Sequence, residues 1–164
     1  MKIMLIISMI LSHPFSGNEF SPGQLRSYYY DASKSTAASE FFYNLMKEAD
    51  TGEPILLGYT GMAAFMKCYH SYNPVNKLNY FGKGKTSLDR AISLAPDNVE
   101  LKYLRFTVQT NVPFFLNYSS SIEDDKKFLI TNYSQVEDEE LQKMIREYMM
   151  SSDFCTAEER KSFQ

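Results

Sequence analysis

The glycine- and lysine-rich stretch at residues 82–87 is the part of the chain whose residue types most suggest chemistry. Its sequence, GKGKTS, contains the Gly-Lys-Thr end of a phosphate-binding loop. That loop also needs a glycine five positions before Gly84, where this chain has Asn79, and a preceding strand, which the sequence does not predict. We therefore predict no phosphate loop here.

The residues that could bind a metal or act as a nucleophile are few. Cys68 and His70 are two possible metal ligands, but the remaining histidine, His13, falls in a segment that we expect to be removed. Two ligands cannot complete a four-ligand zinc site, and no serine stands in a nucleophile-elbow motif. The acidic run at residues 123–125 suits the first turn of a helix, where carboxylates stabilise the helix dipole. The sequence thus predicts a protein without a cofactor or a catalytic site.

A polar stripe offers the best candidate for a binding surface. Lys102, Arg105 and Gln109 recur at helical spacing, and Asn111 lies close to the aromatic loop at residues 113–118, PFFLNY. We predict that these four side chains bind a protein or a peptide, and that Arg105→Ala weakens binding more than folding. In the alternative interpretation they cap and bridge neighbouring helices, as most buried polar groups do.

The stripe is positioned by a joint between two helices. Four apolar residues fall at i, i+3, i+4 and i+7 and mark the buried face of the first helix: Leu88, Ala91, Ile92 and Ala95. Pro96 ends that helix, because its ring removes a backbone donor and crowds the preceding turn. Asp97 or Asn98 can then cap the next helix.

The second helix of the joint, Val99–Asn111, carries apolar residues on two opposite sides. Leu101 and Leu104 share one side, and Tyr103 and Phe106 share the other. A helix that is apolar on two sides is normally covered on both. We predict that this helix is central, with other helices packed on either flank.

The rest of the chain also has helical periodicity. The segment Pro54–His70 contains Gly58 and Gly61, which predicts a buried helix approached closely by a neighbouring backbone. For the helix at residues 36–49, spacing predicts an inward face of Ala37, Phe41, Leu45 and Ala49. Further helices are expected at residues 22–32, 76–94, 121–131 and 137–150, with Ser121 and Thr156 as capping-box residues. The predicted fold is all-α, built of stacked antiparallel helix hairpins.

Composition and charge limit the possible partners. The net charge of −3 gives no basic footprint for nucleic acid. Residues 66–105 hold seven Lys and Arg against three Asp and Glu, whereas residues 119–164 hold six against eleven. These are either ordinary solvated helix faces or a basic middle that docks the acidic tail or an anionic ligand. The length suits one domain, which we place at residues 18–164.

The N-terminus has the pattern of a secretory signal. Lys2 precedes an apolar run at residues 3–11, and small residues follow near Ser16 and Gly17. We predict a signal peptide at residues 1–17 and a periplasmic or secreted mature protein. No later segment is apolar enough for stable membrane insertion. Cys68 and Cys155 could then form a disulfide, but a free Cys68 in an apolar helix is also a satisfactory small hydrophobe.

Two resemblances accompany these patterns. Gly84, Leu88 and the residues up to Pro96, with Leu57, Gly58 and Gly61 before them, resemble about one tetratricopeptide repeat. The mature chain also resembles small exported bacterial proteins known mainly as hypothetical proteins, through residues 98–106, Gln109, Asn111 and residues 113–118 and 122–126. The resemblance to such repeats implies a helical stack with a peptide-binding face, and that to the exported proteins implies a location outside the cytoplasm.

We carry two functional hypotheses forward. The first is a non-catalytic exported module that binds a protein or peptide through a helical face. The second is a small ligand-binding protein or hydrolase with a pocket between the central helices, using Arg105 and a carboxylate such as Glu100. The single mature histidine and the lack of a nucleophile setting favour the first.

Overall fold

The computed structural model describes residues 20–49 and 52–164, and these residues are almost entirely helical. They form eight α-helices and three short 3-10 helices, and no strand occurs among them. The predicted all-α class is confirmed. The predicted signal peptide at residues 1–17 lies outside the residues that the structure describes.

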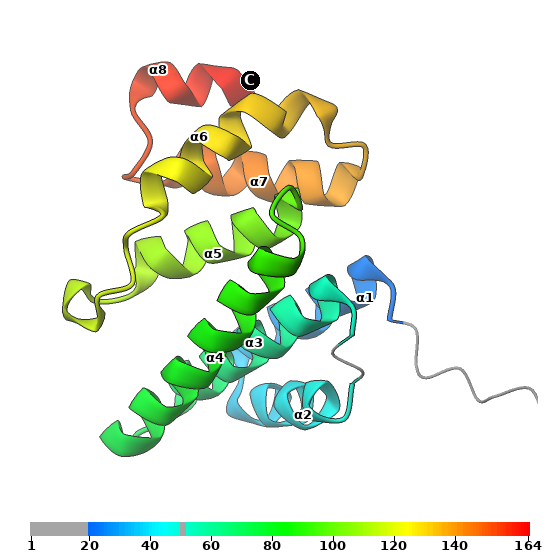
Figure 1. Ribbon diagram of the computed structural model, residues 1–164, viewed down its shortest axis with the longest axis vertical. Coiled ribbons are helices and arrows are strands. Elements are labelled where there is room, and N and C mark those ends of the chain that lie inside the picture. Colours follow the sequence, from blue (N-terminus) through cyan, green and yellow to red (C-terminus); the bar gives the residue numbers. More distant parts are fainter. Residues whose placement is uncertain (1–19, 50–51) are drawn as a thin grey trace, which may run out of the picture.

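The helices pack mainly against their neighbours along the chain (Figure 1). The long helix α4 runs diagonally alongside α3, with α2 below them and with α5, α6 and α7 stacked above. The α-helices are α1 Pro22–Lys34, α2 Thr36–Lys47, α3 Pro54–His70, α4 Pro74–Leu94, α5 Val99–Asn111, α6 Ile122–Asn132, α7 Glu139–Ser151 and α8 Ala157–Arg160. The 3-10 helices are η1 Phe114–Leu116, η2 Tyr133–Gln135 and η3 Lys161–Phe163.

Helices α3 and α4 approach each other closely where Gly61 of α3 lies against Gly84 of α4. A Cβ atom added to Gly61 would stand 2.8 Å from the carbonyl oxygen of Gly84 and 3.0 Å from the backbone nitrogen of Leu88. A Cβ on Gly58 would overlap Leu101 of α5 at 2.3 Å. The glycines of α3 therefore let two other helices approach its backbone, as the sequence predicted.

Helix α5 is covered on both flanks, which confirms its predicted central position. Leu101, Leu104 and Phe106 are completely buried, and Tyr103 is nearly so. Asn98 caps the start of α5, and its side chain accepts a hydrogen bond from the Leu101 amide at 3.0 Å. Burial on two sides requires neighbours before and after α5 in the chain, and α3, α4, α6 and α7 supply them.

The predicted inward face of α2 is wrong. Phe41 is largely exposed, whereas Ser39, Phe42 and Met46 are the buried residues. A row of residues spaced strictly by four drifts around the helix, because four residues advance by about 400°. The buried residues instead follow the spacing i, i+3 and i+7, which stays on one side.

Two predicted caps have different outcomes. Ser121 precedes α6 but makes no side-chain cap hydrogen bond, so the predicted capping box there is wrong. Its backbone torsions, φ −108° and ψ 5°, are not the extended ones from which a cap side chain accepts. Thr156 does form a capping box with Glu159.

Cys68 and Cys155 are both free thiols, so the structure contains no disulfide between them. Among the helices that the structure describes, none combines the length and apolarity needed to cross a membrane. The tetratricopeptide-like stacking stays a prediction.

Candidate functional site

The predicted stripe is largely engaged in holding α5 against α6. Arg105 donates two hydrogen bonds of 2.7 Å, from Nε and from a terminal nitrogen, to the two carboxylate oxygens of Asp125. Lys102 lies 3.6 Å from the same carboxylate. Asp125 is completely buried, and Arg105 and Lys102 compensate the cost of burying its negative charge. This geometry favours a structural role for Lys102 and Arg105.

The other two residues of the stripe lie apart from this ion pair. Gln109 is buried, and neither polar atom of its side-chain amide has a hydrogen-bond partner among the residues described. Asn111 is exposed and donates to the Thr107 carbonyl at 2.8 Å and to the Tyr148 hydroxyl at 2.6 Å. The four side chains therefore do not form one continuous surface.

The carboxylate of the alternative hypothesis, Glu100, is also occupied. It accepts two hydrogen bonds from Arg26, at 2.8 and 2.9 Å, and one of 2.6 Å from the Tyr59 hydroxyl. Arg26 is 3 % exposed and also donates to Asp138 and Glu140 at the start of α7. Glu100 and Arg105 thus belong to two separate ion clusters, and neither cluster leaves a free pair for a substrate.

A hollow of about 740 Å³ lies where the end of α3, the start of α4, the end of α5 and η1 meet, and Tyr29 of α1 and Tyr148 of α7 also line it. We call it the groove. Its walls are mainly apolar and include Phe65, Met66, Leu78, Phe81, Val108 and Phe115. Asn111 is the one residue of the predicted stripe that lines it. Of the predicted aromatic loop, Pro113, Phe115 and Leu116 line it as well.

Phe65 and Phe81 line the groove, and the absence of a side chain at Gly84 leaves space for the Phe65 ring. A Cβ atom on Gly84 would stand 2.9 Å from the ring of Phe65, so the ring fits only because that position is glycine. Phe65 packs edge-on against Phe81 at 5.6 Å, and both rings contact Tyr118. Three elements, α3, α4 and the loop after η1, are thereby fixed around one cluster.

The loop after α5 sends its aromatic residues to opposite sides. Asn117 adopts the left-handed conformation, with φ 50°, directly after η1. This reverses the chain, so that Tyr118 enters the core while Phe114 and Phe115 project outward. Tyr118 is anchored there by a 2.8 Å hydrogen bond to Asp89. The exposed rings are therefore held by a fixed turn.

The groove offers binding chemistry and little reactive chemistry. Burial raises the pKa of Tyr29 to about 12 and also raises that of Tyr103, so both phenols stay protonated at neutral pH. Burial likewise raises the pKa of the Cys68 thiol, which disfavours the nucleophilic thiolate. Tyr148 shares its hydroxyl with Thr110 and Asn111. None of the described residues that line the groove is a carboxylate or a histidine that could act as a base.

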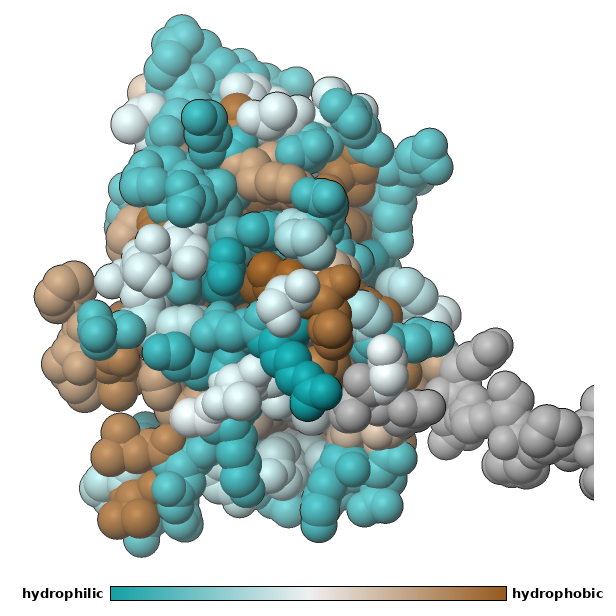
Figure 2. Space-filling view, viewed as in Figure 1, coloured by the Kyte–Doolittle hydropathy of each residue, from teal (hydrophilic) through white to brown (hydrophobic). Residues whose placement is uncertain are grey.

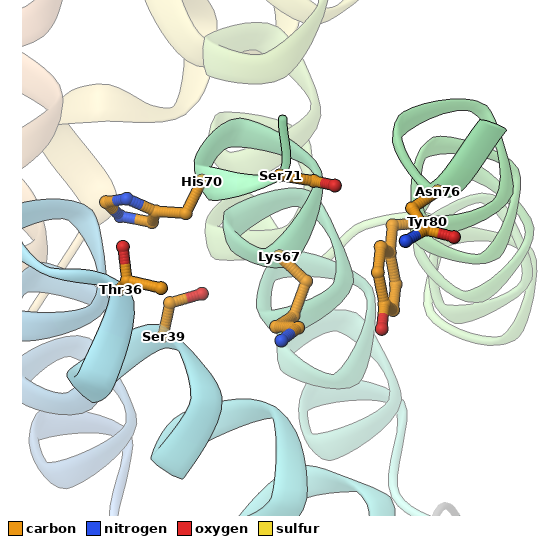
Figure 3. A pocket seen from close by; sticks show the side chains of 7 residues that line it. All are labelled: Thr36, Ser39, Lys67, His70, Ser71, Asn76 and Tyr80. Atoms are coloured by element: carbon orange, nitrogen blue, oxygen red, sulfur yellow. The ribbon is translucent and has the colours of Figure 1, made fainter. Parts of the chain in front are cut away.

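A second, smaller hollow of about 110 Å³ lies between α2, α3 and α4 (Figure 3). Its side chains are polar, and those with the strongest donors are already occupied. His70 contacts the Ala32 carbonyl oxygen through Nε2 at 2.8 Å, and Lys67 pairs with Glu40. Ser39 is buried without a hydrogen-bond partner in the described chain. The hollow suits a few waters and is too small for most ligands.

The groove was not recognised from the sequence as a unit, although parts of it carried signals. The aromatic loop at residues 113–118 was singled out, but the apolar residues around Pro74 were not. Tyr69, Tyr72 and Leu78 are exposed there in spite of their size. Large apolar residues clustered around a helix-breaking loop are the signal that could have found this wall.

In the residues that the structure describes, no three His, Cys, Asp or Glu side chains come together as a metal site would require. Comparisons with models of protein families, with curated proteins and with solved structures give no match to this chain.

Proposed function

We propose that this protein is a non-catalytic binding protein, and that the groove between α3, α4, α5 and η1 receives an apolar segment of a partner protein. The observation that supports this most directly is the groove itself, a hollow of about 740 Å³ with mainly apolar walls. Exposed apolar surface of this kind typically marks an interaction site.

The apolar surface continues beyond the groove, which favours a protein partner over a small metabolite. Phe114 is 86 % exposed and Tyr72 is 98 % exposed, and neither lines the hollow. Val75 adds a third exposed apolar side chain beside them. Figure 2 shows apolar residues gathered along this edge of the molecule, over the η1 loop and the beginning of α4. A molecule confined to the groove would leave these side chains in water.

The location that we propose is outside the cytoplasm, in the periplasm or as a secreted protein. This rests on the signal-like pattern of residues 1–17 in the sequence. The partner would then be a protein that the mature chain meets after export. Nucleic acid is not proposed as a partner, because the net charge is −3.

A small amphiphilic molecule is the second candidate ligand. The groove volume falls within the range of about 300–1,000 Å³ that is usual for small-molecule sites. Lys77, at its edge, could bind an anionic head group. This corresponds to the alternative hypothesis of a ligand-binding protein, without its hydrolase activity.

Two leucines of α4 allow a matched test. Leu78 lines the groove and is 59 % exposed, whereas Leu94 at the other end of the helix is 55 % exposed and lies outside it. Covering Leu78 in a complex should contribute about 1–2 kcal/mol, or roughly a tenfold change in Kd. Peptides selected from a displayed library on the wild-type protein should lose about this much affinity for Leu78→Gln and none for Leu94→Gln.

The proposal fails if the selected peptides do not distinguish Leu78→Gln from Leu94→Gln, or if the selection yields no binder. Thermal stabilisation of the wild-type protein by a fatty acid, in the absence of any peptide binder, would support the second candidate. Both variants replace exposed side chains, so neither should prevent folding.

A further inference from the structure

We propose that the occupant of the groove is an amphipathic α-helix of a partner protein, with an acidic residue beside its apolar face that pairs with Lys77. This inference rests on the proposed function and names the class of peptide that the groove takes. It follows from the backbone of the groove walls, from their apolarity and from their charge.

The walls offer an extended peptide few backbone partners. Apart from residues 112–116, the lining residues stand on the α-helices α1, α3, α4, α5 and α7, whose interior amides and carbonyls bond to one another. In the connecting segment, the Val112 amide donates to Val108 at 3.1 Å and the Leu116 amide donates to Pro113 at 3.0 Å. Pro113 has no amide hydrogen. The described residues contain no strand edge to which a peptide strand could be added.

A peptide that enters this groove must therefore satisfy its own backbone. An α-helix does so, because every interior amide bonds to a carbonyl four residues earlier. A helix also presents its apolar residues on one side, at i, i+3, i+4 and i+7, while its opposite side stays in water. The half-open groove, with exposed Phe115 and Leu78 on its rim, suits a guest that is apolar on one side only.

The charge of the groove wall favours an acidic residue on the bound helix. Among the described residues that line the groove, Lys77 alone is charged, and no carboxylate lines it. Lys77 is exposed and forms no ion pair with any residue in the part of the chain that the structure describes. It stands in the first turns of α4, where the helix dipole is positive and no acidic residue compensates it. A carboxylate on the guest would meet both positive charges.

Three synthetic peptides of about five helical turns test this inference. The first carries leucines at i, i+3, i+4 and i+7 with glutamates beside them. The second has the same composition with leucines at alternate positions, as a strand would have, and the third replaces the glutamates of the first by lysines. Kd is measured by fluorescence anisotropy, and helix content in the complex by circular dichroism.

The first peptide should bind at least about tenfold more tightly than the second and should gain helix on binding. Lys77→Glu should reverse the preference between the first and third peptides, because Lys77 carries the only charge among the described residues of the groove wall. Leu78→Gln should weaken the first peptide, and Leu94→Gln should not. A preference for glutamate that survives in Lys77→Glu would overturn the charge argument.

The failure of this inference can be told apart from the failure of the proposed function. If the second peptide binds as tightly as the first, and Leu78→Gln still weakens it, the groove binds peptides without preferring a helix, and only this inference fails. If none of the three peptides binds, and peptides selected from the library bind Leu78→Gln as tightly as Leu94→Gln, the proposed function fails as well. Self-association of the wild-type protein that Leu78→Gln abolishes would make a second copy the occupant and would also overturn the inference.

Discussion

Replacing the glycine at the contact of α3 and α4 tests the packing on which the groove depends. In Gly61→Ala, the new Cβ would stand 2.8 Å from the Gly84 carbonyl oxygen and 3.0 Å from the Leu88 nitrogen. Both neighbours are backbone atoms and cannot swing away as a side chain could. Gly82→Ala is the matched control, since a Cβ there meets no atom of the described chain within 4 Å.

The two substitutions should change stability in different ways. Replacing a glycine inside a helix by alanine stabilises by about 1 kcal/mol when nothing obstructs the methyl group. Gly82→Ala should gain this amount. Gly61→Ala gains the same helix propensity but also overpacks the contact, which costs roughly 1–3 kcal/mol. The two variants should therefore differ by about 1–3 kcal/mol in their free energy of unfolding.

Thermal unfolding followed by circular dichroism measures this difference. For a chain of this length, it corresponds to roughly 2–12 °C in Tm, with Gly61→Ala the lower of the two. Gly61→Ala should also weaken peptide binding, because the separated helices carry the walls of the groove. If Gly61→Ala is as stable as Gly82→Ala, the two helices do not approach as closely as the structure shows, and the argument fails.

Three further results are expected. Arg105→Ala should lower the free energy of unfolding by about 3 kcal/mol, because it leaves the buried Asp125 without its main partner. Chemical denaturation measures this loss. An unchanged denaturation midpoint would favour the binding role that the sequence predicts for Arg105. Hydrogen bonds from Arg26 lower the pKa of Asp138 in the folded protein. The ionised carboxylate therefore stabilises the fold at pH values above its unfolded pKa of about 4. This contribution is lost as the pH falls through the lower, folded pKa. Asp138→Asn should therefore flatten the loss of Tm on acidification, and an equal loss in both proteins would contradict this. A helical peptide in the groove should slow the alkylation of Cys68 but not that of Cys155, as mass spectrometry of the labelled protein would show.

The parts of the fold that the sequence predicts well are those in which one helix carries enough information by itself. The two apolar sides of Val99–Asn111 predict a covered helix, because burial of both sides is the arrangement that removes them from water. Gly58 and Gly61 predict a close approach, because their cost within a helix needs a compensating contact. The α2 face was missed because the helix offers both Phe41 and Phe42, and only the tertiary contacts select Phe42.

The candidate site was harder to predict because its parts are distant in the chain. The polar stripe was recognised from its spacing, but the partner of Arg105 lies 20 residues later, in α6. The partner of Arg26 lies 74 residues later, at Glu100. No local pattern states which carboxylate a cation will meet. The groove likewise combines residues of α1, α3, α4, α5, η1 and α7, and only its aromatic loop has a local signal.

The position of Arg26 bears on the order in which the chain can fold as it is synthesised. Two of its carboxylate partners, Asp138 and Glu140, follow it by 112 and 114 residues. Until the ribosome has made them, seating α1 would bury the Nη1 group of Arg26 without its carboxylate acceptors, and an unsatisfied buried donor costs free energy. A fragment that stops after Asn132 should accordingly be digested by proteases faster than the whole chain. The hydrogen bonding of Arg26 thus makes the stable seating of α1 depend on carboxylates that are synthesised 112 and 114 residues later.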